Sequence, residues 1–154
     1  MREIDRLFEK YGESHQNKFN KIIHWIFVPL IVLSLLGLCW SIPFPEIIPG
    51  FPYINVATFV VIFAFIFYIR LSVPLAIVML FLIGGGVCLI EIVYQSEYPL
   101  WLVSLGVFVV SWVFQFVGHE VEGKKPSFID DLKFLLVGPI WLLHFLFKKL
   151  GLKY

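Results

Sequence analysis

Polar side chains recur at helical spacing in an otherwise apolar stretch that ends near Pro126. Ser111, Gln115, His119 and Glu122 follow one another at steps of three or four residues, which places their side chains on one face of a helix. Hydrocarbon penalises polar side chains, so such a stripe faces the interior of a helix bundle or a cavity, and its members are candidates for function. The stripe ends in an imidazole and a carboxylate, which are both metal ligands.

The chain has four histidines: His15, His24, His119 and His144. With the membrane spans assigned below, the first three lie at one membrane face, and His144 joins them if the last helix folds back. Imidazole is the commonest metal ligand near neutral pH. On one unbroken helix, His15 and His24 would lie about 180° and ~13 Å apart, so they can share a metal ion only if the chain breaks between them.

Two asparagines provide that break. Asn17 and Asn20 are of the residue type that favours turns and helix N-caps, and we expect Asn20 to cap the first span. His119 and Glu122, three residues apart, could then offer two further ligands from one helix. A histidine-rich set with one carboxylate and open positions suits non-haem Fe(II) and oxygen chemistry, and it also suits zinc.

Each candidate, taken alone, has a structural alternative. A histidine can hydrogen-bond a carbonyl at the membrane interface, interact with a helix C-terminus, be solvated in a loop or be satisfied in the core. The residues concerned are, in that order, His24, His119, His15 and His144. Glu122 could pair with Lys124 or Lys125. Only the joint arrangement favours a metal site.

The composition is that of an integral membrane protein. Of 154 residues, 60% are hydrophobic and 15% are charged, with a mean hydropathy of +0.90, whereas soluble domains are about 45–50% apolar and about 25% charged. We therefore expect residues 1–154 to form a single all-α domain with the lipid bilayer as its partner. The basic residues form no large cluster, which argues against nucleic acid. Cys39 and Cys88 lie in apolar runs and are interpreted as small core residues.

Hydrophobic runs near the ~20 residues needed to cross a bilayer predict four transmembrane helices, at about 22–40, 53–69, 75–94 and 100–118. Leu7, Phe8 and Tyr11 predict a short amphipathic helix on the membrane surface, which Gly12 ends. A last helix is expected at about 128–149. Gly138-Pro139 should kink it, and its short apolar length makes it re-entrant or interfacial.

The basic residues indicate the orientation. Lysine and arginine occur in residues 1–21, in the second turn at Arg70, in residues 118–133 and in the tail, and they are missing from the other two loops. With four spans, all of them fall on one side, which the positive-inside rule makes cytoplasmic. Both termini are therefore expected in the cytoplasm.

Two spaced motifs carry a resemblance to a known family. The first is Tyr11-x3-His15-x4-Asn20-x3-His24-Trp-Ile-Phe-Val-Pro29. The second is Trp112-x2-Gln115-Phe-Val-Gly118-His119, followed by Glu122-Gly-Lys-Lys-Pro126 and Asp130-Asp-Leu132. From about Tyr11 to Lys149 the chain resembles the small multi-pass membrane proteins that include the fungal endoplasmic-reticulum 2-hydroxy fatty acid dioxygenase. The short chain resembles bacterial members, which implies a bacterial inner membrane, or the endoplasmic reticulum if the source is eukaryotic.

The resemblance implies an Fe(II)-dependent dioxygenase. A 2-hydroxy fatty acid and O2 would give a fatty acid one carbon shorter, a reaction that serves phytosphingosine breakdown in the fungal member. The implied iron ligands are His15, His24 and His119. Glu122 is a further candidate, although it follows the histidine one residue sooner than in the fungal-type motif. His144 stands near the place of a family glutamate and is also a candidate ligand.

We hypothesise a position for the substrate that fits this chemistry and the predicted spans. Its acyl chain would lie among the spans, and its carboxylate and 2-hydroxyl would chelate iron at headgroup level. Lysines would hold the carboxylate electrostatically, and two amide side chains, Gln115 and Asn20, would orient the ligands. The lysines are Lys18, Lys21, Lys124 and Lys125. Two alternatives are a zinc-dependent membrane lipid hydrolase or modifying enzyme, and a small transporter or scaffold with structural histidines.

Overall fold

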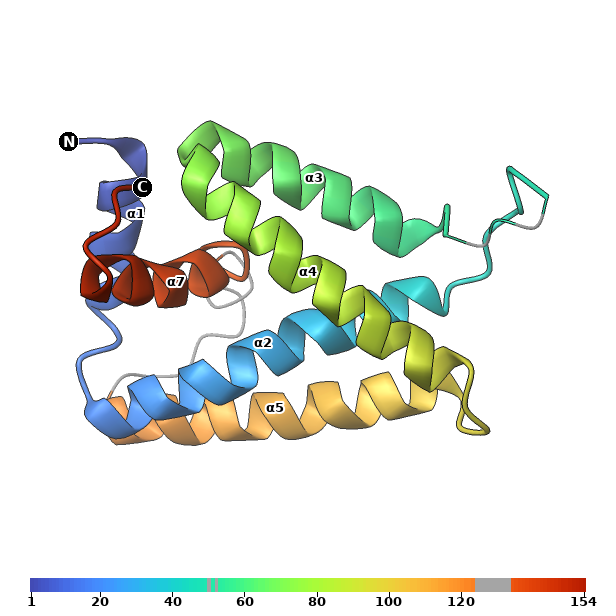
Figure 1. Ribbon diagram of the computed structural model, residues 1–154. Coiled ribbons are helices and arrows are strands. Elements are labelled where there is room, and N and C mark those ends of the chain that lie inside the picture. Colours follow the sequence, from blue (N-terminus) through green and yellow to red (C-terminus); the bar gives the residue numbers. More distant parts are fainter. Residues whose placement is uncertain (50, 52, 124–133) are drawn as a thin grey trace.

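All regular structure in the described residues is helical, as the sequence predicts. The computed structural model describes residues 1–49, 51, 53–123 and 134–154. Its helices are α1 (Glu3–Gly12), α2 (Lys18–Trp40), α3 (Val56–Leu71), α4 (Val73–Tyr94), α5 (Leu100–Glu122) and α7 (Val137–Lys149) (Figure 1).

Two antiparallel helix pairs form the body of the protein. Helices α2 and α5 lie side by side along most of their length, and α3 and α4 form the second pair (Figure 1). A tight turn at Ser72 joins α3 to α4, where the Ser72 side chain accepts from the Leu75 N–H. Helices α1 and α7 pack together at the end of the molecule that carries both termini. This arrangement brings the first turns of α2, the last turns of α5 and the two short helices to one place.

Three helices have the length and composition to cross a membrane, namely α2, α4 and α5. Helix α3 is also apolar but has 16 residues, about 24 Å at 1.5 Å per residue, which is shorter than the ~30 Å hydrocarbon core. A fourth crossing through α3 therefore stays a prediction. Helix α5 continues past the expected end at 118 to Glu122, so His119 belongs to the helix itself.

Two local predictions about helix ends are wrong. Asn17 caps α2, since its side chain accepts from the Phe19 N–H at 2.8 Å, whereas Asn20 lies inside the first turn and is fully buried. Both asparagines suit a cap by type, and burial rather than propensity decides between them. Helix α7 begins at Val137, so Pro139 lies in its first turn, where no intrahelical N–H is lost and no kink arises. The expected start at 128 lies outside the described residues.

The N-terminal helix packs on protein. The apolar face of α1, with Ile4, Phe8 and Tyr11, is buried, and α1 contacts α7. Most of α7 is buried as well, and its 13 residues span about 20 Å, which is too short for a crossing. Arg2 links the ends of the chain, because its guanidinium lies 5.1 Å from the centre of the Tyr154 ring.

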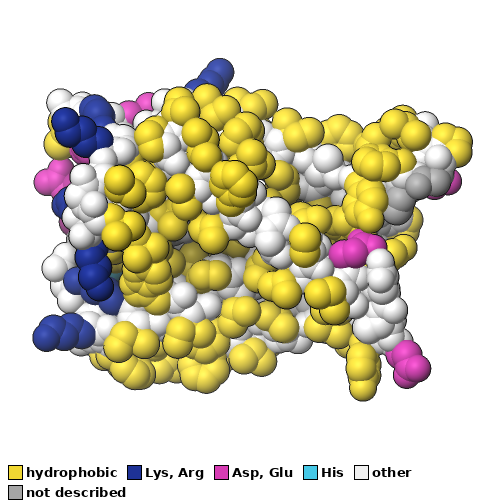
Figure 2. All heavy atoms as spheres, viewed as in Figure 1, with side chains coloured by type: hydrophobic (Ala, Val, Ile, Leu, Met, Phe, Trp, Pro, Cys, Tyr) yellow, Lys and Arg dark blue, Asp and Glu magenta, His cyan; other side chains and the backbone are white. Residues whose placement is uncertain are grey.

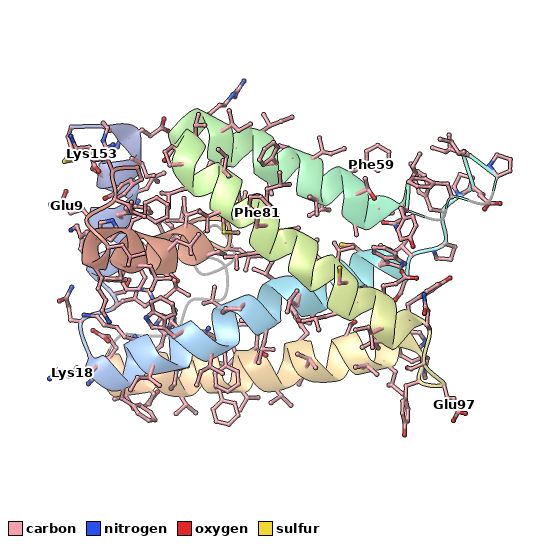
Figure 3. All side chains as sticks on the ribbon, viewed as in Figure 1. Glu9, Lys18, Phe59, Phe81, Glu97 and Lys153 are labelled. Atoms are coloured by element: carbon pink, nitrogen blue, oxygen red, sulfur yellow. The ribbon has the colours of Figure 1, made fainter. Side chains whose placement is uncertain are left out.

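Charged residues gather at the two ends of the long axis. In the view of Figure 2, lysines and arginines lie mainly at the end that holds the termini, together with some acidic residues, and a broad hydrophobic surface separates them from acidic residues at the other end. Figure 3 shows Lys18, Lys153 and Glu9 at one end, Glu97 at the other, and Phe59 and Phe81 between them. An apolar band between polar ends is the surface expected of a membrane protein.

Helices α2 and α5 approach each other closely at two glycines. A Cβ at Gly37 would lie 2.2 Å from Ser104 Oγ, and a Cβ at Gly118 would lie 2.4 Å from Asn20 Oδ1. Small residues at helix contacts allow this approach in membranes. The contact at Gly118 matters for the site described below, because it seats Asn20 against α5.

Gly37→Ala should therefore destabilise the protein relative to Gly106→Ala. Both variants gain about 0.5–1 kcal/mol from replacing glycine in a helix, but the Cβ at position 106 meets nothing within 4 Å. Overpacking at position 37 costs about 1–3 kcal/mol. Unfolding in detergent should show this difference, and adding Ser104→Ala should recover part of it. Equal stability of the two alanine variants would contradict a tight contact between α2 and α5.

Candidate metal centre

Three histidines from three parts of the chain meet at the end of the bundle that carries α1 and α7. His15 lies in the link between α1 and α2, His24 in the second turn of α2 and His119 near the end of α5. All three are buried, with exposures of 2%, 3% and 4%. The link breaks the helix between His15 and His24, as the sequence requires if the two are to meet.

The three imidazoles converge. One nitrogen from each histidine can be chosen so that all three atoms lie within 4.8 Å of one another. The Nε2 atoms of His15 and His24 are 2.8 Å apart, and the ring centre of His119 lies 5.6 Å from that of His15 and 5.5 Å from that of His24. The predicted convergence is confirmed, and the binding of a metal ion there stays a prediction.

Backbone carbonyls fix the orientation of two of the rings. His15 Nδ1 lies 2.6 Å from the Tyr11 carbonyl oxygen, and His24 Nδ1 lies 3.1 Å from that of Asn20. A carbonyl oxygen only accepts, so Nδ1 carries the hydrogen in both rings. The Tyr11 ring also stacks on His15, with ring centres 4.2 Å apart and planes 13° apart. These contacts direct both Nε2 atoms to the same point.

This orientation creates an electrostatic requirement. With hydrogen on Nδ1, each neutral ring has a lone pair on Nε2, and the two lone pairs face each other across 2.8 Å. Two such atoms repel unless a cation lies between them. A proton there would create a buried imidazolium, which is costly, whereas a metal ion uses both lone pairs. Metal-binding histidines typically donate their second N–H to a carbonyl in this way, so the donor set fits a metal ion.

Glu122 does not join the group. Its carboxylate accepts from the backbone N–H of Gln16 at 2.7 Å, from that of Asn17 at 2.9 Å and from Asn20 Nδ2 at 3.0 Å. The N–H groups of Gln16 and Asn17 lie just before α2, where the positive end of the helix dipole also favours a carboxylate. These hydrogen bonds use the oxygens that were expected to bind metal. Glu122 instead ties the end of α5 to the link that carries His15.

Asn20 connects the same parts. Its Nδ2 donates to the Ser14 carbonyl at 3.3 Å as well as to Glu122, and its own carbonyl orients His24. This placement agrees with the expected orienting role. Tyr11 and Gly118 belong to the two sequence motifs, but residue type and spacing alone predicted no role for them at the site. Tyr11 orients His15, and Gly118 leaves the space that Asn20 occupies.

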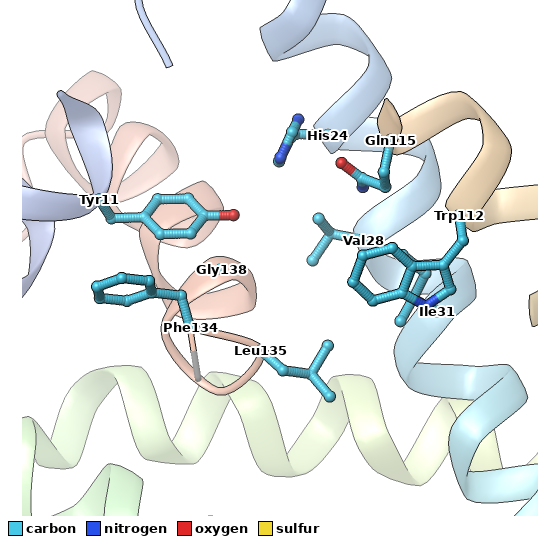
Figure 4. Close-up of a pocket in the computed structure, with 9 residues that line it drawn as sticks. All are labelled: Tyr11, His24, Val28, Ile31, Trp112, Gln115, Phe134, Leu135 and Gly138. Atoms are coloured by element: carbon cyan, nitrogen blue, oxygen red, sulfur yellow. The ribbon is translucent and has the colours of Figure 1, made fainter. Parts of the chain in front are cut away.

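Gln115 faces a cavity and makes no hydrogen bond to a histidine. It is 3% exposed, and neither polar atom of its amide has a hydrogen-bond partner among the described residues. The cavity, of about 20 Å³, is lined also by Tyr11, His24, Val28 and Trp112 (Figure 4). That is room for about one water-sized molecule. The amide is therefore available to a ligand, and the expected role as an orienter of a histidine has no hydrogen bond to support it.

The remaining candidates lie apart from the group. The His144 ring packs 4.8 Å from Phe8 and 5.2 Å from Tyr154, between α1, α7 and the tail, and it is not part of the histidine group. Burial, followed by the charge of Lys148, lowers the pKa of His144. Lys21 is half-buried in the first turn of α2.

Three other lysines were expected to hold the substrate carboxylate. Lys18 is exposed at the start of α2, and Lys124 and Lys125 lie outside the described residues.

Comparisons with known proteins identify the family of this chain. Residues 1–150 match the model of a family described as "2-hydroxy-palmitic acid dioxygenase Mpo1-like". The chain is 33% identical over 146 residues to the 2-hydroxy-palmitic acid dioxygenase MPO1 of Saccharomyces cerevisiae, covering 90% of this chain and 76% of the yeast protein. No solved structure shows a significant match. This chain therefore belongs to the Mpo1-like family.

Proposed function

We propose that this protein is an Fe(II)-dependent dioxygenase that shortens 2-hydroxy fatty acids by one carbon. The family and the yeast relative support a dioxygenase that acts on such acids. The observation that carries the metal is the pair of facing Nε2 atoms, 2.8 Å apart, each on a ring whose Nδ1 is held by a carbonyl.

The reaction balances with O2 as the only oxidant. A 2-hydroxy acid and one O2 give the shorter carboxylic acid, carbon dioxide and water. The bond between C1 and C2 breaks, C1 leaves as carbon dioxide, and C2 becomes the new carboxyl carbon. The substrate loses four electrons, and O2 takes up four. Iron, when bound, supplies the Lewis acid for the two substrate oxygens and the redox chemistry of O2.

The name of the yeast relative favours iron over zinc, because a dioxygenase needs redox chemistry with O2 and zinc has none. The three histidines by themselves suit either ion. His15, His24 and His119 would hold the ion, and a site with only three protein ligands leaves room for substrate oxygens.

The protein's own groups supply binding and water exclusion. The ligands are buried beside Tyr11 and Trp112, which line the cavity next to His24. Gln115 faces this cavity with a free amide, whose N–H donates to a substrate oxygen and whose oxygen accepts from the 2-hydroxyl. Lys21, in the first turn of α2, lies where the positive charge attracts a carboxylate to the headgroup level.

Metal content tests the site directly. Detergent-purified protein, loaded anaerobically with Fe(II), should retain iron and consume O2 with a 2-hydroxy fatty acid. His24→Ala should weaken iron binding by more than the ~10–100-fold that the loss of an outer partner costs. His144→Ala is the matched control and should retain iron, since His144 is outside the group. Zinc in place of iron, with no O2 consumption, would indicate a hydrolase instead, and no metal at all would contradict the site.

Glu122→Gln tests the link that carries His15. The change removes the charge that holds the N–H groups of Gln16 and Asn17, so iron affinity should fall about tenfold. Activity should return at saturating Fe(II), because the ligands are intact. Glu120→Gln, an exposed position on the same helix, should leave iron affinity unchanged. A loss of activity that excess iron does not restore would instead assign Glu122 a role in chemistry.

Gln115→Leu should raise stability and lower activity together. It removes a buried amide without partners, and replacing such a group with an apolar one of similar shape is neutral or stabilising. The substrate loses its hydrogen bonds, so KM should rise about 10–100-fold, equivalent to about 1–3 kcal/mol, while iron content stays the same. Unfolding temperature, KM and iron content check the three effects, and an unchanged KM would exclude a contact between Gln115 and the substrate.

A further inference from the structure

An apolar groove of about 600 Å³ lies on the membrane-facing side of the bundle, between α2, α4 and α7. Its lining includes Trp25 and Pro29 of α2, Gly85 of α4, and Pro139 and Leu146 of α7. Pockets for small ligands usually measure about 300–1,000 Å³. Apart from the indole N–H of Trp25, the lining side chains offer no hydrogen-bonding group, so the groove is complementary to a hydrocarbon.

The run of three glycines in α4 shapes this groove. The helix continues unbroken through Gly84-Gly85-Gly86, so the triplet is not a local break. A Cβ at Gly86 would lie 2.3 Å from Leu33 Cδ2, which marks a close contact with α2. Gly85 lines the groove, whereas Gly84 does not, and a Cβ at either of them meets nothing within 4 Å. Gly85 thus provides a hollow where a side chain would otherwise lie.

The groove adjoins the histidine cavity. The two share the same turns, because His24 and Val28 line the cavity while their neighbours Trp25 and Pro29 line the groove. On α7, Gly138 lines the cavity and its neighbour Pro139 lines the groove.

A small, mostly apolar cavity between α2, α3 and α4 borders both spaces. It shares Leu135 with the histidine cavity and shares Val32, Leu36, Met79 and Ile83 with the groove. The apolar lining is therefore continuous from the site to the groove.

We infer that the groove binds the hydrocarbon tail of the 2-hydroxy fatty acid whose polar head lies at the histidine group. This inference rests on the proposed function and adds a tail site to it. Trp25, Leu82 and Leu89 line the groove and are exposed, so the groove opens sideways to the bilayer, where a fatty acid resides. The substrate enters laterally, and the groove makes affinity depend on chain length.

Two leucine variants test this. Gly85→Leu fills the groove, and Gly84→Leu adds the same side chain one residue away, outside it. Equilibrium binding and turnover would be measured with 2-hydroxyhexadecanoic and 2-hydroxyoctanoic acid, on detergent-purified full-length protein. Each methylene that is no longer buried weakens binding roughly fourfold. Gly85→Leu should therefore weaken binding of the long acid roughly tenfold or more and leave the short one unchanged, and Gly84→Leu should change neither.

An unchanged preference for the long acid in Gly85→Leu, or an equal loss in both leucine variants, would overturn the tail site. The proposed function fails separately. If the wild type consumes no O2 but binds the long acid more tightly than the short one, and Gly85→Leu abolishes that difference, the tail site stands and the dioxygenase proposal falls.

Discussion

The close approach of two imidazole nitrogens in a buried place is the constraint around which the site is built. His15 and His24 point their Nε2 atoms at each other because carbonyls hold the opposite nitrogens. The apolar surroundings make that arrangement expensive without a positive charge. The contacts around it serve one geometric purpose. Asn20 orients His24, Gly118 makes room for Asn20, and Glu122 holds the link that carries His15.

Different parts of the protein supply rigidity and access. His24 and His119 stand on α2 and α5, which are the most extensively packed pair in the fold, and spanning helices hold ligands at fixed positions. The polar stripe of α5 contributes to both. Ser111 is buried by protein, whereas Gln115 faces a cavity. The surface between the charged ends is apolar, so the lipid substrate proposed above would reach the site without leaving the membrane.

Hydrophobic run length and helical spacing predict the helices well, because they depend on the local sequence. The all-helical fold, the inward stripe on α5 and the break between His15 and His24 are confirmed. The errors arise where several partners compete for one group. Composition could not show that the N-terminus of α2 would take the carboxylate of Glu122, or that α1 would bury its apolar face on α7. Nor could it show that Pro139 would fall in the first turn of its helix.

The docking of α1 on α7 determines when the site can form during synthesis. His15 follows α1 directly, and its carbonyl partner Tyr11 lies in that helix, which packs against a segment more than a hundred residues later in the chain. A nascent chain with α2 and α5 already inserted can pair His24 with His119, but it has no surface on which α1 can dock. The contacts that position His15 are complete only after α7 has been synthesised. A chain that stops before α7 therefore lacks the surface that holds the third histidine in place.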